Sequence, residues 1–142
     1  MVRKYYSRLF LVLMLSALSC SGYARTVKEI IIKASGLTIE PDARNTKEGC
    51  KDFRPTLAQV RHYFNKAYPV EAYVVVTDRY SPCYAEGTLK FSDGSFGEWV
   101  LFSSGTASFI FNRGDHVNFY YKYNKWTDPT ACTYGLSDKG EC

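Results

Sequence analysis

The sequence predicts an α+β domain in which one helix packs on a four- to five-stranded antiparallel meander held by two disulfides. Two patterns indicate this class: apolar residues recur at helical spacing over residues 56–68, and they alternate with period two over residues 72–123. The composition agrees, because 46% of the 142 residues are hydrophobic, 16% are aromatic and only 23% are charged. These proportions are typical of one packed domain and exclude a disordered chain, a collagen and a long coiled coil.

Residues 1–24 have the organisation of a secretory signal peptide: a basic start, an apolar run over 9–18 and small residues before Arg25. The run is about ten residues long, whereas a membrane-spanning helix needs about 20, so we expect cleavage rather than a retained anchor. A lipoprotein signal is the alternative, because Cys20 directly follows the apolar run. Residues 25–142 then form a bacterial domain that is periplasmic or secreted, and that meets a membrane only if lipid is attached at Cys20.

Cleavage also changes the charge of the protein. Lys plus Arg falls from 18 to 15 when Arg3, Lys4 and Arg8 are lost, against 14 acidic residues, so the net charge drops from +4 to about +1. No basic cluster remains in the mature chain to neutralise a run of phosphates, and we therefore expect no nucleic-acid partner.

The mature chain opens with a predicted strand, the β-branched run Val27–Ile32, and a loop over 35–55 that is rich in Gly, Pro and Asn. A capping box then predicts a helix over 56–68, since the Thr56 hydroxyl and the Gln59 side chain are spaced to cap each other's backbone. His62 falls on the solvent side of this helix. The apolar stripe is formed by Leu57, Val60, Phe64, Ala67 and Tyr68.

Beyond Pro69, which ends the helix, alternation predicts five strands, the last four of which are joined by short Gly-containing turns. A two-residue Asp93-Gly94 turn would place Leu89 opposite Glu98, and a two-residue Ser104-Gly105 turn would place Phe102 opposite Ala107. The expected strands are Ala72–Thr77, Tyr84–Phe91, Phe96–Phe102, Ala107–Asn112 and His116–Tyr123. In this register the helix covers Leu89, Phe91, Phe96, Val100, Phe102, Phe109, Phe111, Val117, Phe119 and Tyr121.

Four cysteines remain after cleavage, which in an exported domain indicates two disulfides. Of the three possible pairings we favour Cys50 with Cys83, and Cys132 with Cys142, the latter tying the irregular tail over 124–142. No CxxC or HxxxH spacing is present, so neither a metal nor another cofactor is expected.

The order of strand, helix and antiparallel strands resembles the cystatin-type arrangement in layout. The resemblance concerns architecture alone, and fold by itself does not fix function.

Two places are candidate binding surfaces. One is the loop from Asp78 to Tyr84, in which Arg79 and Tyr80 precede a cysteine that can hold the loop rigid. The other is the sheet face turned away from the helix, which is exposed unless the N-terminal strand or the tail covers it. In the predicted register this outer face carries Lys90, Trp99, Leu101, Ile110, Tyr120 and Lys122, with Thr88 beside them.

The sequence favours a non-enzymatic domain that binds another protein, of the inhibitor or toxin-immunity kind. Export, small size, an aromatic sheet face and the lack of G-x-S-x-G, HExxH and P-loop motifs indicate this class. An alternative is a carbohydrate-binding or adhesin-like module, for which Trp99 or Tyr80 would lie in a shallow groove beside carboxylate or amide groups. A third is a small cell-envelope hydrolase with Glu98 as its acid.

Overall fold

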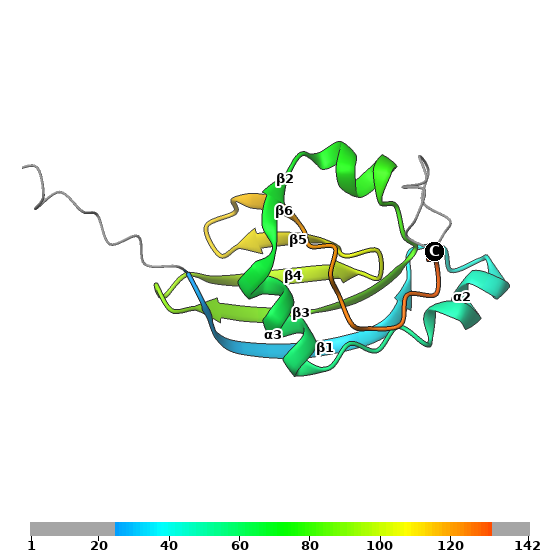
Figure 1. Ribbon diagram of the computed structural model, residues 1–142, viewed down its shortest axis with the longest axis horizontal. Helices are drawn as coiled ribbons and strands as arrows, with labels where there is room; N and C mark the ends of the chain where they lie inside the picture. Colours follow the sequence, from blue (N-terminus) through cyan, green and yellow to red (C-terminus); the bar gives the residue numbers. More distant parts are fainter. Residues whose placement is uncertain (1–24, 132–142) are drawn as a thin grey trace, which may run out of the picture.

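A computed structural model describes residues 25–131 of the chain, so the predicted leader and Cys132 and Cys142 lie outside the described residues. The described part is an α+β fold with a six-stranded antiparallel sheet in the order β1-β3-β4-β5-β6-β2. In Figure 1, α3 crosses one face of this sheet, and the chain after β6 runs over the same face. The elements are β1 (Val27–Thr38), α2 (Arg44–Cys50), α3 (Leu57–Lys66), β2 (Tyr68–Val70), the π-helix η1 (Val74–Asp78), β3 (Cys83–Phe91), β4 (Phe96–Phe102), β5 (Thr106–Phe111) and β6 (His116–Tyr120).

The capping box that starts α3 is confirmed: Gln59 N donates to Thr56 Oγ1, and Thr56 N donates to the Gln59 side chain. The helix ends earlier than the predicted 56–68, because the residue before Pro69 favours extended backbone and joins β2. Its buried face is formed by Val60, Tyr63 and Phe64. The predicted stripe is wrong at its two ends, since Leu57 and Tyr68 are exposed.

The sheet register differs from the prediction by one residue on β4. Each hairpin loop from β3 to β6 contains three residues, and the glycine at its third position has a positive φ of 85° (Gly94), 87° (Gly105) or 94° (Gly114). Leu89 therefore pairs with Gly97 rather than Glu98, and Leu101 rather than Phe102 pairs with Ala107. A one-residue shift turns every side chain over.

The shift exchanges the two faces of β4. Trp99 and Leu101, predicted on the outer face, are buried in the core, whereas Phe96, Val100 and Phe102 leave the core-facing set. On β3, β4 and β5 the odd-numbered side chains face α3, and Val117, Phe119 and Tyr121 pack against the same core as predicted. The outer face consequently loses its predicted tryptophan.

Two glycines on the buried side make room for the large rings of the core. A Cβ atom at Gly87 would lie 1.9 Å from the carbonyl oxygen of Ile31 and 2.6 Å from a ring carbon of Trp99. A Cβ at Gly97 would lie 2.1 Å from the Ile110 carbonyl oxygen. Both distances are far inside van der Waals contact, so these positions accept only glycine without a shift of the neighbouring strand.

Other differences concern the segments around the meander. Residues 72–77, predicted as a strand, form the helical turn that contains η1, because β2 already occupies the edge of β6. Strand β1 extends to Thr38 and pairs along the whole of β3, with register shifts that bend it. The predicted 35–55 loop contains the short helix α2.

The disulfide between Cys50 and Cys83 is confirmed, with both sulfurs buried. It ties the end of α2 to the start of β3, two elements separated by 33 residues in the chain. The second predicted bridge lies outside the described residues.

Candidate functional site

The outer face of the sheet, opposite α3, holds a groove of about 630 Å³ to which four strands contribute. Its apolar centre is formed by Ile31 of β1, Phe96 of β4 and Ile110 of β5, which are 60%, 49% and 53% exposed. The groove, called the outer groove below, is lined by Glu29, Ile30, Ile31, Thr88, Leu89, Lys90, Phe96, Gly97, Glu98, Ile110, Phe111 and Asn112. Single exposed apolar residues are ordinary, but large ones gathered in one depression mark a binding surface.

Charged side chains of both signs border the outer groove. Lys33 Nζ lies 2.8 Å from Glu98 Oε1, and this hydrogen bond and the lysine charge hold the pKa of Glu98 below its usual value. A carboxyl with a lowered pKa is ionised near neutrality, which does not suit a general acid. The expectation that Glu98 lies beside Leu89 on the apolar side is wrong, because Glu98 pairs with Thr88 and is exposed.

Three predicted outer-face residues line the outer groove, namely Thr88, Lys90 and Ile110. Tyr120, like Trp99 and Leu101, is buried and does not line it. Lys122 follows the end of β6 and is exposed outside the groove. Ile31 and Phe96 also belong to this surface and were not predicted on it. A three-residue loop at Gly94 would have placed Phe96 there, since loop length decides which face a strand shows.

Arg79, predicted as a binding residue of an exposed loop, is nearly buried and packs against the sheet. It is 9% exposed, and its guanidinium carbon lies 5.2 Å from the centre of the Tyr120 ring. The segment after η1 thus shields the β6 end of the outer face. The N-terminal strand, considered as a cover for this face, is instead the edge strand β1.

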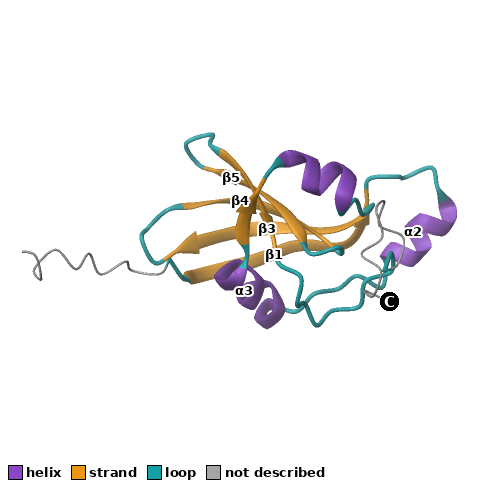
Figure 2. Ribbon diagram, turned by 45° about the horizontal axis from the view of Figure 1, so that its top comes forward, coloured by secondary structure: helices purple, strands orange, loops and turns teal. Residues whose placement is uncertain are grey.

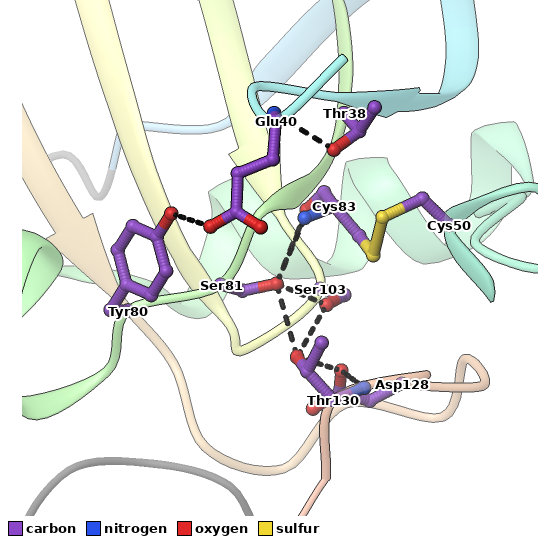
Figure 3. Close-up of a disulfide and its surroundings, with 9 residues drawn as sticks. All are labelled: Thr38, Glu40, Cys50, Tyr80, Ser81, Cys83, Ser103, Asp128 and Thr130. Atoms are coloured by element: carbon purple, nitrogen blue, oxygen red, sulfur yellow. Dashed lines mark hydrogen bonds between the residues drawn. A yellow bond between two sulfur atoms is a disulfide. The ribbon is translucent and has the colours of Figure 1, made fainter. Parts of the chain in front are cut away.

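Tyr80 lies in a second depression of about 470 Å³, at the opposite end of β3 from the hairpin that joins it to β4. Tyr80 is 40% exposed. Its hydroxyl donates a 2.6 Å hydrogen bond to Glu40, which Figure 3 draws as a dashed line. This bond to Glu40 raises the pKa of Tyr80, with burial adding to the effect. The depression, called the Tyr80 cleft, is lined by Asn45, Thr46, Gly49, Tyr80, Pro82, Cys83, Pro129 and Thr130.

A buried hydroxyl network fixes the segments around the Tyr80 cleft. The Ser81 and Ser103 Oγ atoms are 2.7 Å apart, and Thr130 Oγ1 lies 3.1 Å from Ser81 Oγ and 3.0 Å from Asp128 Oδ1. Trp126 Nε1 donates to the Ser103 carbonyl at 2.9 Å. Figure 3 shows this network beside the Cys50–Cys83 disulfide. Residues 128–131 are therefore held against the loop that carries Tyr80.

Within residues 25–131, no group of three or more His, Cys, Asp or Glu side chains is arranged to hold a metal ion. In the same range no helix is long and apolar enough to cross a membrane. His62 is exposed, as the helix pattern predicted, and its ring meets Tyr121 edge to face at 5.7 Å.

Comparison of the chain with protein-family models, with curated proteins and with solved structures gives no match. The two depressions are therefore interpreted from their geometry and chemistry.

Proposed function

We propose that the protein is an exported, non-enzymatic domain that binds another protein through the outer groove, in the manner of an inhibitor or immunity protein. The observation that carries the proposal is the convergence of Ile31, Phe96 and Ile110 in one groove on the sheet face opposite α3. Figure 2, turned from Figure 1, shows α3 as a layer on one side of the sheet.

The apolar centre offers enough binding energy to matter. Complete burial of an exposed Ile or Phe side chain contributes about 1.5–3 kcal/mol, so each of these half-exposed residues has about 1 kcal/mol still to gain. Three such residues side by side, bordered by charges that exclude wrong partners, have the character of an interface hot spot. The partner that fits is a protein presenting an apolar protrusion with acidic and basic groups around it, to meet Lys90 and Glu29.

Two features support export. The buried Cys50–Cys83 disulfide is of the kind that forms and persists in an oxidising compartment. The leader over residues 1–24 has the three-part organisation of a secretory signal. In this proposal the partner is a secreted toxin or an enzyme of the cell envelope, and lipid at Cys20 would keep the encounter at a membrane surface.

A photoreactive phenylalanine analogue at position 110 tests the proposal in the cells that make the protein. The same analogue at position 76 is the matched control, because Val76 is 67% exposed on η1 and lies outside the outer groove. We expect one protein to be cross-linked from position 110 and not from position 76.

The captured protein is then purified, and its affinity is measured for the wild type, Ile110→Asp and Val76→Asp. We expect Ile110→Asp to weaken binding by at least about tenfold and Val76→Asp to leave it unchanged. Equal cross-linking from the two positions, or equal affinity of the two variants, would refute the proposal. Denaturant midpoints confirm that each variant is folded.

A further inference from the structure

We infer that the Tyr80 cleft is a second binding site, separate from the outer groove, and that its ligand is a neutral saccharide. The two depressions have no lining residue in common. The inference goes beyond the proposed protein-binding function and does not depend on it.

The lining of the Tyr80 cleft has the chemistry that a sugar requires. None of its lining residues is Asp, Glu, Lys or Arg, so a charged ligand would find no counter-ion among them. Asn45 and Thr46 supply an amide and a hydroxyl, which both donate and accept hydrogen bonds as sugar hydroxyls do. The volume of about 470 Å³ lies within the usual range of small-molecule sites and accommodates one or two sugar rings.

Polar groups on one side of the cleft are unengaged. Within the described chain the side chains of Asn45 and Thr46 make no hydrogen bond, although both line the cleft. Asn45 is exposed and Thr46 is half-buried, so both can bind a ligand without breaking a hydrogen bond to the described residues. Both residues belong to the first turn of α2 and line the same depression as Tyr80.

The aromatic wall is held in place before any ligand binds. The Tyr80 hydroxyl is fixed by Glu40 at 2.6 Å, which leaves the face and edge of the ring available for stacking on the apolar face of a sugar. The adjacent Ser81 is anchored by Ser103 and Thr130, so the loop that carries the ring is rigid. Figure 3 shows Tyr80, Glu40 and this network side by side. A ring that is already oriented loses little entropy on binding, which favours affinity in a small site.

The test begins with the mature protein on a glycan array, followed by calorimetric titration with the strongest glycan and with glucose, galactose and N-acetylglucosamine. The variants are Tyr80→Ala, which removes the ring, Tyr80→Phe, which keeps the ring and loses the bond to Glu40, and Asn45→Ala. Tyr73→Ala is the matched control, because Tyr73 is 58% exposed and does not line the cleft. Denaturant midpoints establish that every variant is folded.

We expect neutral glycans to bind, with affinity at least about tenfold weaker in Tyr80→Ala and in Asn45→Ala, a few-fold weaker in Tyr80→Phe and unchanged in Tyr73→Ala. Three results would overturn the inference: no binding of any glycan or free sugar, binding that survives Tyr80→Ala, or binding of acidic glycans alone. Ile110→Asp should leave glycan binding unchanged, and Tyr80→Ala should leave protein cross-linking from position 110 unchanged. The results for one site therefore do not decide the result for the other.

Discussion

Removal of the Cys50–Cys83 bridge should cost the protein a large share of its stability. The bridge closes a span of 33 residues. The chain-entropy relation for a loop of that length gives about 12.5 cal/mol/K, or about 3.7 kcal/mol near room temperature, through the unfolded state. Both cysteines are buried, so replacing the sulfurs in Cys50→Ala/Cys83→Ala also leaves small voids worth about 1 kcal/mol each. We expect a total loss of about 4–6 kcal/mol.

Guanidinium denaturation followed by tryptophan fluorescence measures this loss, because Trp99 is buried in the core. The double variant should unfold at a lower midpoint and with a steeper dependence on denaturant, since an unfolded chain without the cross-link exposes more surface. A loss below about 1.5 kcal/mol with an unchanged slope would refute the reasoning that the bridge acts on the unfolded state.

The predicted Cys132–Cys142 bridge provides the comparison. It would close a span of about ten residues, and the same relation gives about 2.7 kcal/mol. Cys132→Ala/Cys142→Ala should therefore destabilise the protein less than the first double variant. A neutral effect would mean that the second bridge is not formed.

Four further substitutions test the core, α2 and the hairpins. Gly87→Ala should lower the free energy of unfolding by about 1–3 kcal/mol or more, because its Cβ would lie 1.9 Å from a backbone oxygen. Gly49→Ala inside α2 should raise the free energy of unfolding by up to about 1 kcal/mol, because nothing lies within 4 Å of its Cβ position. Tyr63→Phe should leave stability equal or higher, since the buried hydroxyl has no hydrogen-bond partner among the described residues; a loss above about 1 kcal/mol in a denaturation curve would contradict this. Ser95→Ala should bring the lowered pKa of Asp93 back toward its usual value of 3.8, because the side chain of Ser95 is the main cause of the lowering. The stabilisation from this carboxylate is present above the pKa of the unfolded chain and is lost as the pH falls through the lower folded value, which an NMR titration of the two forms would follow.

The helix and most strands of the meander were predictable because their signals are local. The Thr56 capping box and the Asp93-Gly94 turn lie within a few residues of the elements they begin or join. The register was not predictable in this way, because Asp93-Gly94 fits both a two-residue turn and the last two positions of a three-residue loop. The choice depends on distant packing, in which Gly87 lies against Trp99.

Local signals also fail for a segment that can form a strand only if an edge of the sheet is free to pair with it. The β-branched run around Val74 has the composition of a strand, but β2 already pairs with β6, and the run forms η1 instead. The residues of the two candidate surfaces were predicted only where local signals decide their exposure. Tyr80 and Ile110 line depressions, since loop position and strand alternation suffice to expose them, whereas the placement of Trp99 required the correct register.

The three-residue hairpin loops also restrict how this chain can change in length. Each loop has an odd number of residues, so the odd-numbered positions stay on the core side from β3 through β6. If one residue is deleted at Gly94 and the hairpin keeps a three-residue loop, Ser95 enters the loop, and Trp99 and every later strand residue turn to the opposite face. The faces are kept only if Phe91 stays opposite Ser95 across a two-residue turn. A single insertion or deletion at one of these three turns should therefore be tolerated only where the turn changes its length and the strand pairing is kept, or where a new bulge in the following strand restores the order.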